Sequence, residues 1–210
     1  MIKLKEMILE NVSVTDTPEF KRWFGNSKIV DKHGNPKIMY HGKRGDDFEC
    51  VKKFDQNKFQ QNEPHQGGEG FYFTNTSGGA CSYTYDKDYN THDKRVGAYY
   101  IKIENPAPNS MVESWKDRIY DKICELDTEQ SKIKGILISH KEKGQILRIL
   151  STKMREWIQS KGHDGYVSVG QIPDNMGEIV VFDPCNIKSA IDNNGDFNPN
   201  DSDTTCENYL

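Results

Sequence analysis

Two long stretches of helical periodicity lie between groups of short strand patterns, and this order limits the folds open to the chain. Apolar residues recur at helical spacing over residues 112–126 and over 146–158, which predicts two amphipathic helices. Strand patterns precede them, and more follow at 165–169, 178–182 and 187–190. Strands at both ends, helices between them and almost no strand–helix alternation predict an α+β fold, not a doubly wound parallel sheet.

The N-terminal half combines a short helix with strands and turns. Residues 17–24, TPEFKRWF, predict a helix with Thr17 as N-cap and Pro18 at the first helical position. The turn formers DKHGNP separate the short strand patterns 27–30 and 37–40, which predicts a hairpin. Further strands are predicted at 51–54, 70–74 and 96–103, with a short helix at 78–85.

Length and composition favour one domain with a tail. The chain has 210 residues, of which 34% are hydrophobic and 29% charged, so the core should be modest. We expect a single domain over residues 1–191. Residues 192–210 have no periodicity and offer only Phe197 to a core, so we expect an acidic, extended or disordered tail.

Cysteine usage and the apolar pattern bear on the compartment. The five cysteines are widely spaced and contain no CxxC pair, which argues against a disulfide framework and a zinc ribbon. No run of about eighteen apolar residues is present, so no membrane-spanning helix is predicted. Lysines interrupt the apolar stretch that a signal peptide would need in residues 1–12. We therefore expect a cytoplasmic protein without membrane contact.

Charge is spread unevenly along the chain. The net charge is −4, yet residues 131–161 hold eight Lys or Arg against two Glu, a local charge of +6. Residues 183–210 hold six acids against Lys188 alone. Composition favours a solvated helix face for the basic stretch, and an acidic partner or nucleic acid stays open as its contact.

Two common kinds of site lack support in the sequence. The six histidines contain no pair at i, i+4, so metal catalysis is not predicted. Gly68 and Gly70 supply two glycines of a dinucleotide fingerprint, but Phe73 takes the third position and no strand precedes them. A Rossmann site is therefore rejected.

Three short segments remain as candidates for chemistry. His41 and Gly42 end a predicted strand, where a glycine lets a ligand approach the backbone. In strand 70–74, alternation puts Tyr72 opposite the two phenylalanines, so it faces a cleft if they fill the core. Glu178 opens an apolar strand at the rim of the core, where a carboxylate is costly unless it is paired or used.

In this order, the segments resemble ADP-ribosyltransferases of the diphtheria-toxin and PARP-like type, which carry a His–Tyr–Glu triad. The chain is most similar to the ADP-ribosyltransferase domains of phage and mobile-element polyvalent proteins. Their motifs correspond here to WFGNSKIVD at 23–31, YHGK at 40–43, GFYFT at 70–74 and the VVFDP to DN ending at 180–193. The resemblance implies a split antiparallel β-sheet core with flanking helices, and the helices over about 108–161 look like an elaboration of it.

The resemblance implies a role for each matching residue. His41 resembles the histidine that hydrogen-bonds the adenosine ribose of NAD, and Gly42 the glycine whose backbone holds the nicotinamide carboxamide. Tyr72 resembles the triad tyrosine that packs on the nicotinamide, and Tyr83 the second stacking tyrosine. Glu178 resembles the catalytic glutamate.

Three positions depart from the wider pattern. Lys43 replaces the usual Thr or Ser after His-Gly. Ala80, in the cofactor-binding set, stands where many members have a serine that binds the carboxamide. Met176 stands two residues before Glu178, so the ExE or QxE pair of the arginine-modifying class is absent.

The resemblance implies an enzyme that uses NAD as co-substrate, needs no metal, and transfers ADP-ribose to a macromolecule. Mono-ADP-ribosylation of a protein is favoured because the chain is acidic overall. An effector or toxin role in a bacterial cell or phage-infected host, with an antitoxin or inhibitor as partner, is the implied setting. Three alternatives stay open: transfer to RNA or DNA through the basic stretch, NAD glycohydrolysis, and a non-catalytic module that binds NAD or a partner.

Overall fold

The computed structural model describes residues 13–44, 49–59, 68–84, 95–132, 140–169 and 176–205; for residues 123, 126–132, 140–143, 168–169 and 176 it describes only the backbone. The chain forms two compact units. Unit 1 comprises the ranges 1–54, 74–104 and 184–210, and unit 2 comprises 55–73 and 105–183. Each unit thus joins segments that are distant in sequence, and the single-domain boundary at residue 191 stays a prediction.

Unit 1 is built on a three-stranded antiparallel sheet. The strand order is β1–β3–β7, with β1 at Ile38–Gly42, β3 at Val96–Ile101 and β7 at Ile187–Ser189. Its helices are α2 at Pro18–Phe24 and α3 at Ser77–Cys81, with short 3-10 turns η1 at Val14–Asp16 and η3 at Pro184–Asn186.

Helix α2 begins where the capping residues predict. The Thr17 hydroxyl accepts a hydrogen bond from the N–H of Phe20 at 3.3 Å, and Pro18 takes the first helical position. The buried side chains are aromatic, and the indole N–H of Trp23 donates to the carbonyl of Cys185 at 3.1 Å. The predicted turn after α2 is also present, because Val30 and Pro36 form an antiparallel bridge.

The segment after β7 differs from the predicted tail. Phe197 is only 1% exposed, and its ring lies 5.1 Å from that of Phe20 and 5.7 Å from that of Trp23. Its φ of +46° lies in a region that bulky residues rarely adopt, so the packing must offset that backbone cost. An extended or disordered tail is therefore wrong for residues 192–205, whereas 206–210 lie outside the described residues.

Backbone hydrogen bonds complete the attachment of this segment. The fully buried amino group of Lys188 donates to the carbonyls of Asp201 and Asp203, at 2.6 and 3.1 Å. The N–H of Thr204 donates to the carbonyl of Lys52 at 2.8 Å. One aromatic anchor and these bonds thus order a segment without apolar periodicity, a combination that composition does not reveal.

Unit 2 contains a four-stranded sheet and two long helices. The strand order is β2–β6–β5–β4, with β2 at Phe71–Phe73, β6 at Met176–Val181, β5 at Gly165–Val169 and β4 at Pro106–Ala107. The β4–β5 pair is parallel and the other pairs are antiparallel. The predicted α+β class is confirmed. The expected sheet was entirely antiparallel, whereas the β4–β5 pair is parallel.

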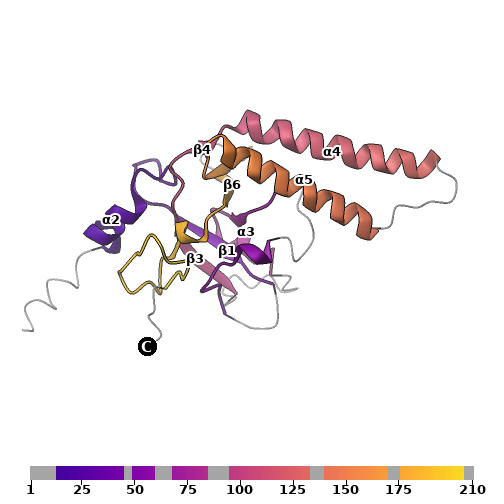
Figure 1. Ribbon diagram of the computed structural model, residues 1–210. Helices are drawn as coiled ribbons and strands as arrows, with labels where there is room; N and C mark the ends of the chain where they lie inside the picture. Colours follow the sequence, from indigo (N-terminus) through magenta and orange to yellow (C-terminus); the bar gives the residue numbers. More distant parts are fainter. Residues whose placement is uncertain are drawn as a thin grey trace, which may run out of the picture. The chain divides into compact units, whose positions relative to one another are not determined.

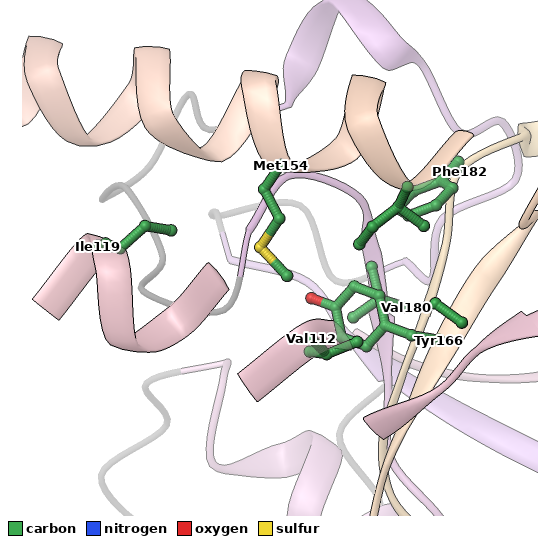
Figure 2. Close-up of a cluster of buried hydrophobic side chains, with 8 residues drawn as sticks. Val112, Ile119, Met154, Tyr166, Val180 and Phe182 are labelled. Carbon is green, nitrogen blue, oxygen red and sulfur yellow. The ribbon is translucent and has the colours of Figure 1, made fainter. Parts of the chain in front are cut away.

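Helices α4 at Asn109–Lys132 and α5 at His140–Ser160 lie side by side (Figure 1), which confirms the two predicted amphipathic helices. They enclose one apolar cluster with the sheet (Figure 2). Ile149 departs from the predicted apolar face, since it is 55% exposed. The cluster contains Val112 and Ile119 from α4, Met154 and Ile158 from α5, Ala107, Tyr166 and Val180 from the sheet, and Phe182 after β6.

Within the described residues, no helix is long and apolar enough to cross a membrane.

The basic stretch is only partly described. Residues 133–139 and the side chains of residues 131–132 and 140–143 lie outside the described part. Arg148 and Lys153 are exposed on α5, whereas Arg155 is paired with Glu69. Contact of this basic stretch with an acidic partner or nucleic acid therefore stays a prediction.

The Phe197→Ala variant should lower the free energy of unfolding by about 3 kcal/mol, because it removes a buried ring from the aromatic cluster. The matched control is Ile191→Ala in the same segment. Its side chain is 77% exposed, and its loss should change stability by no more than about 0.5 kcal/mol. Denaturant unfolding measures both variants, and equal effects would contradict the described packing of this segment.

Candidate functional site

His41 lies half-buried on β1 beside the aromatic ring of Phe54. Across the β1–β3 ladder it faces Gly97, which has no side chain. The ring of Phe54 meets the imidazole edge-on, with 5.1 Å between centroids, and Phe54 packs in turn on Tyr99 at 5.4 Å. The Tyr99 hydroxyl donates to the carbonyl of Val51 at 2.7 Å. His41 is therefore positioned by an aromatic wall that is itself hydrogen-bonded in place.

Gly42 lets the end of β1 approach the end of α3. A Cβ at this position would overlap the backbone carbonyl of Ala80, with the carbonyl carbon 2.9 Å away. Only a glycine avoids that overlap without a backbone shift. Tyr83 follows within one turn, and its N–H donates to the carbonyl of Ala80 at 3.1 Å. Within unit 1, the structure thus brings together four predicted NAD-binding positions: His41, Gly42, Ala80 and Tyr83.

Helix α3 is short and tightly packed. Its N-cap Thr76 accepts from the N–H of Gly79 at 3.0 Å, and the Thr84 hydroxyl donates to the carbonyl of Cys81 at 2.8 Å. Ala80 is fully buried, so its methyl group contributes packing and no hydrogen bond. The helix ends at Cys81, before the predicted end, and residue 85 lies outside the described residues.

In unit 2, Tyr72 and Glu178 come from paired strands. Tyr72 lies opposite Val180 on β6, and Glu178 lies two residues before Val180, so the two side chains share a face of the sheet. Such diagonal neighbours are about 7–8 Å apart. Both residues are half-buried. The structure thus brings together the predicted tyrosine and glutamate of the triad.

A β-bulge lies beside Glu178. In the β5–β6 ladder, Val167 pairs with Ile179, and the next pair is Val169 with Met176. An advance of two residues along β5 thus corresponds to three residues along β6. The extra residue of β6 therefore falls at 177–178. Bulges interrupt the ladder and re-aim side chains, and they are frequent next to active sites.

The hydroxyl of Tyr72 points into the interior of unit 2. It donates a hydrogen bond to the carbonyl of Gly68 and lies 3.4 Å from the hydroxyl of Tyr166. The predicted alternation is confirmed, because Phe71 and Phe73 are buried on the other face. The face of Tyr72 is not simply an open cleft, since Tyr72 packs against the cluster in Figure 2.

Tyr166 is the neighbour that sequence reasoning missed. It is 2% exposed, and burial raises the pKa of its hydroxyl far above the usual value, with the charges of Glu178 and Glu113 adding to the rise. The strand pattern at 165–169 places Tyr166 in a strand, but only the β5–β6 register sets it beside Tyr72.

The segment that precedes β2 is anchored on α5. The guanidinium Nε of Arg155 donates to the Glu69 carboxylate at 2.7 Å, and both side chains are largely buried. The Arg155 guanidinium also lies over the ring of Phe59, 5.8 Å from its centroid. Glu69, just before β2, is therefore tied to α5 by this ion pair.

The protein is thus of the α+β class. In unit 1, β1 ends with His41 and Gly42, and in unit 2, Tyr72 and Glu178 lie on the paired strands β2 and β6. A family model described as ADP-ribosyltransferase in polyvalent proteins matches residues 31–197. The chain belongs to this family, whose members use NAD as substrate. The matched range contains His41, Tyr72 and Glu178. The chain matches no curated protein and no solved structure.

Acidic, histidine and cysteine side chains do not form a metal site in the part of the chain that the structure describes. No group of three or more of them is placed to hold an ion there. The features next to the candidate residues are instead aromatic rings, glycine contacts and one carboxylate.

The Gly42→Ala variant should lose about 1–3 kcal/mol of stability, because the new methyl group meets backbone that cannot rotate away. Gly78→Ala is the matched control in α3. Its Cβ would meet nothing within 4 Å, so it should be neutral or gain up to about 1 kcal/mol from helix propensity. Urea unfolding measures both. Wild-type stability of Gly42→Ala would contradict the close approach of β1 to α3.

Proposed function

We propose that this protein cleaves NAD at the nicotinamide–ribose bond and transfers ADP-ribose to a protein acceptor, as mono-ADP-ribosylation. The observation that carries the proposal is the family match over residues 31–197, a range that contains the predicted triad positions His41, Tyr72 and Glu178. The pairing of β2 with β6 supports it, because it sets Tyr72 and Glu178 on one face of the sheet.

The chemistry assigns the central role to Glu178. When the bond between the ribose anomeric carbon and nicotinamide breaks, nicotinamide leaves with the electron pair and the sugar becomes oxocarbenium-like. The Glu178 carboxylate accepts a hydrogen bond from the ribose 2′-hydroxyl and stabilises the positive charge. An acceptor nucleophile then forms a bond to the anomeric carbon and releases its proton to water. A fixed negative charge aimed at a developing positive charge is an effective form of transition-state stabilisation.

The other candidate residues bind and orient NAD. The rings of Tyr72 and Tyr83 stack on the planar nicotinamide, which supplies contact area and fixes the reacting bond. His41 donates a hydrogen bond to the adenosine ribose, and the backbone of Gly42 holds the carboxamide. Because Ala80 has no hydroxyl group, the Gly42 backbone carries this recognition without a serine at that position.

Glu178→Gln should reduce NAD cleavage by roughly 10²–10³-fold, because it keeps size and hydrogen bonding but removes the stabilising charge. NAD affinity, measured by calorimetry, should stay near that of the wild type. Glu156→Gln, at an exposed position of α5, is the matched control and should leave turnover unchanged. A Glu178→Gln protein that turns over NAD at the wild-type rate would refute the assignment.

The acceptor is identified by incubating the protein with NAD labelled in its ADP-ribose part and whole-cell lysate, followed by separation of protein, RNA and DNA. We expect the label in the protein fraction and not in a Glu178→Gln reaction. Label in RNA or DNA would instead favour the basic stretch as an acceptor contact, since phosphate binding follows local charge. Release of free ADP-ribose without any acceptor would indicate a glycohydrolase.

The biological setting is proposed from the family. From the resemblance we propose a cytoplasmic effector or toxin role in a bacterial cell or phage-infected host, with an antitoxin or inhibitor as partner. Growth arrest on expression of the wild type, absent with Glu178→Gln, would support the toxin role.

A further inference from the structure

A short chain of hydrogen bonds runs through the buried side of Tyr72. Its hydroxyl carries one proton, and the carbonyl of Gly68 can only accept, so the proton of Tyr72 points to Gly68. The hydroxyl of Tyr166 lies 3.4 Å from that of Tyr72 and must therefore be the donor between the two. The direction of the chain is Tyr166 to Tyr72 to Gly68.

Tyr166 is suited to be a permanent donor. It is 2% exposed and belongs to the apolar cluster between the sheet and the long helices. In Figure 2 its hydroxyl lies on the side of the ring toward Met154. Burial in this cluster raises the pKa of Tyr166, so its hydroxyl keeps the proton across the ordinary pH range.

The acceptor end of the chain is equally constrained. Gly68 has a φ of +95°, and a Cβ there would lie 2.9 Å from the sulfur of Met154 and 3.5 Å from the Tyr166 hydroxyl. The next residue, Glu69, is held by Arg155 of α5. The Gly68 carbonyl is therefore presented to Tyr72 by groups that are themselves packed and paired.

We propose that Tyr166 is a positioning residue that fixes the ring of Tyr72 for stacking on the nicotinamide of NAD. This inference rests on the proposed function, because it takes Tyr72 to contact NAD. Tyr166 is too buried to touch the substrate and acts through Tyr72. A hydrogen bond at its hydroxyl limits how far the Tyr72 side chain can swing. Less conformational freedom of Tyr72 is then lost when NAD binds.

Stacking acts on bound substrate and transition state alike, so loss of the positioning should raise KM and leave kcat nearly unchanged. We expect Tyr166→Phe to raise the KM for NAD roughly 3–10-fold, the loss typical of one neutral hydrogen bond. Tyr72→Phe keeps the ring, breaks the same chain and should have a similar effect. The double variant should be no worse than either single variant, because both remove one coupled interaction.

The matched control is Tyr100→Phe. Tyr100 is a buried tyrosine of the aromatic cluster in unit 1, 7% exposed, and its loss should leave the KM unchanged. A merely structural role of Tyr166 would reduce the active fraction, which lowers kcat and leaves KM alone. That result, or a wild-type KM in Tyr166→Phe, would overturn the inference while the wild-type enzyme still supports the proposed function.

A spectroscopic readout tests the hydrogen-bond chain without turnover. In protein labelled with carbon-13 at tyrosine Cζ, the Tyr72 signal is assigned by its loss in Tyr72→Phe. It should shift in Tyr166→Phe and stay in place in Tyr100→Phe. An unshifted signal would overturn the inference. A wild type that neither binds nor cleaves NAD would instead overturn the proposed function, and the inference with it.

Discussion

The candidate site in unit 2 depends on one interaction, the antiparallel pairing of β2 with β6. It sets Tyr72 opposite Val180, and β5 adds Tyr166 on the other side of the same Val180. The side chains of Tyr72, Val180 and Tyr166 thus lie in one row on one face of the sheet, although Tyr72 is far from the other two in the sequence. A register shift of one residue would turn Tyr72 or Glu178 to the opposite face.

Packing against the sheet explains why the two long helices matter to this row. Met154 and Ile158 of α5 close the cluster around Tyr166, and Arg155, between them in sequence, holds Glu69. Both helices lie within the range that the family model matches, and α5 anchors the segment that accepts the hydrogen bond of Tyr72. The long helices thus take part in supporting the candidate site of unit 2.

Local signals in the sequence were reliable where the physics is local. Thr17 and Pro18 start α2 because capping involves only the next few residues, and the periodicity of α4 and α5 reflects one buried face. The segment after β7 shows the opposite case. Its order rests on Phe197 meeting rings from residues 20–24 and on Thr204 meeting Lys52, contacts that composition does not encode.

Residue types and their spacing along the chain were enough to predict the α+β class, the main helices and strands, and the candidate positions His41, Gly42, Tyr72, Tyr83, Ala80 and Glu178. Three features become visible only in the folded chain: the contact of Gly42 with Ala80, the bulge beside Glu178, and the approach of Tyr166 to the Tyr72 hydroxyl. Each of these depends on strand register or on the approach of distant backbones, which is set by the packing of the whole unit and not by any local pattern.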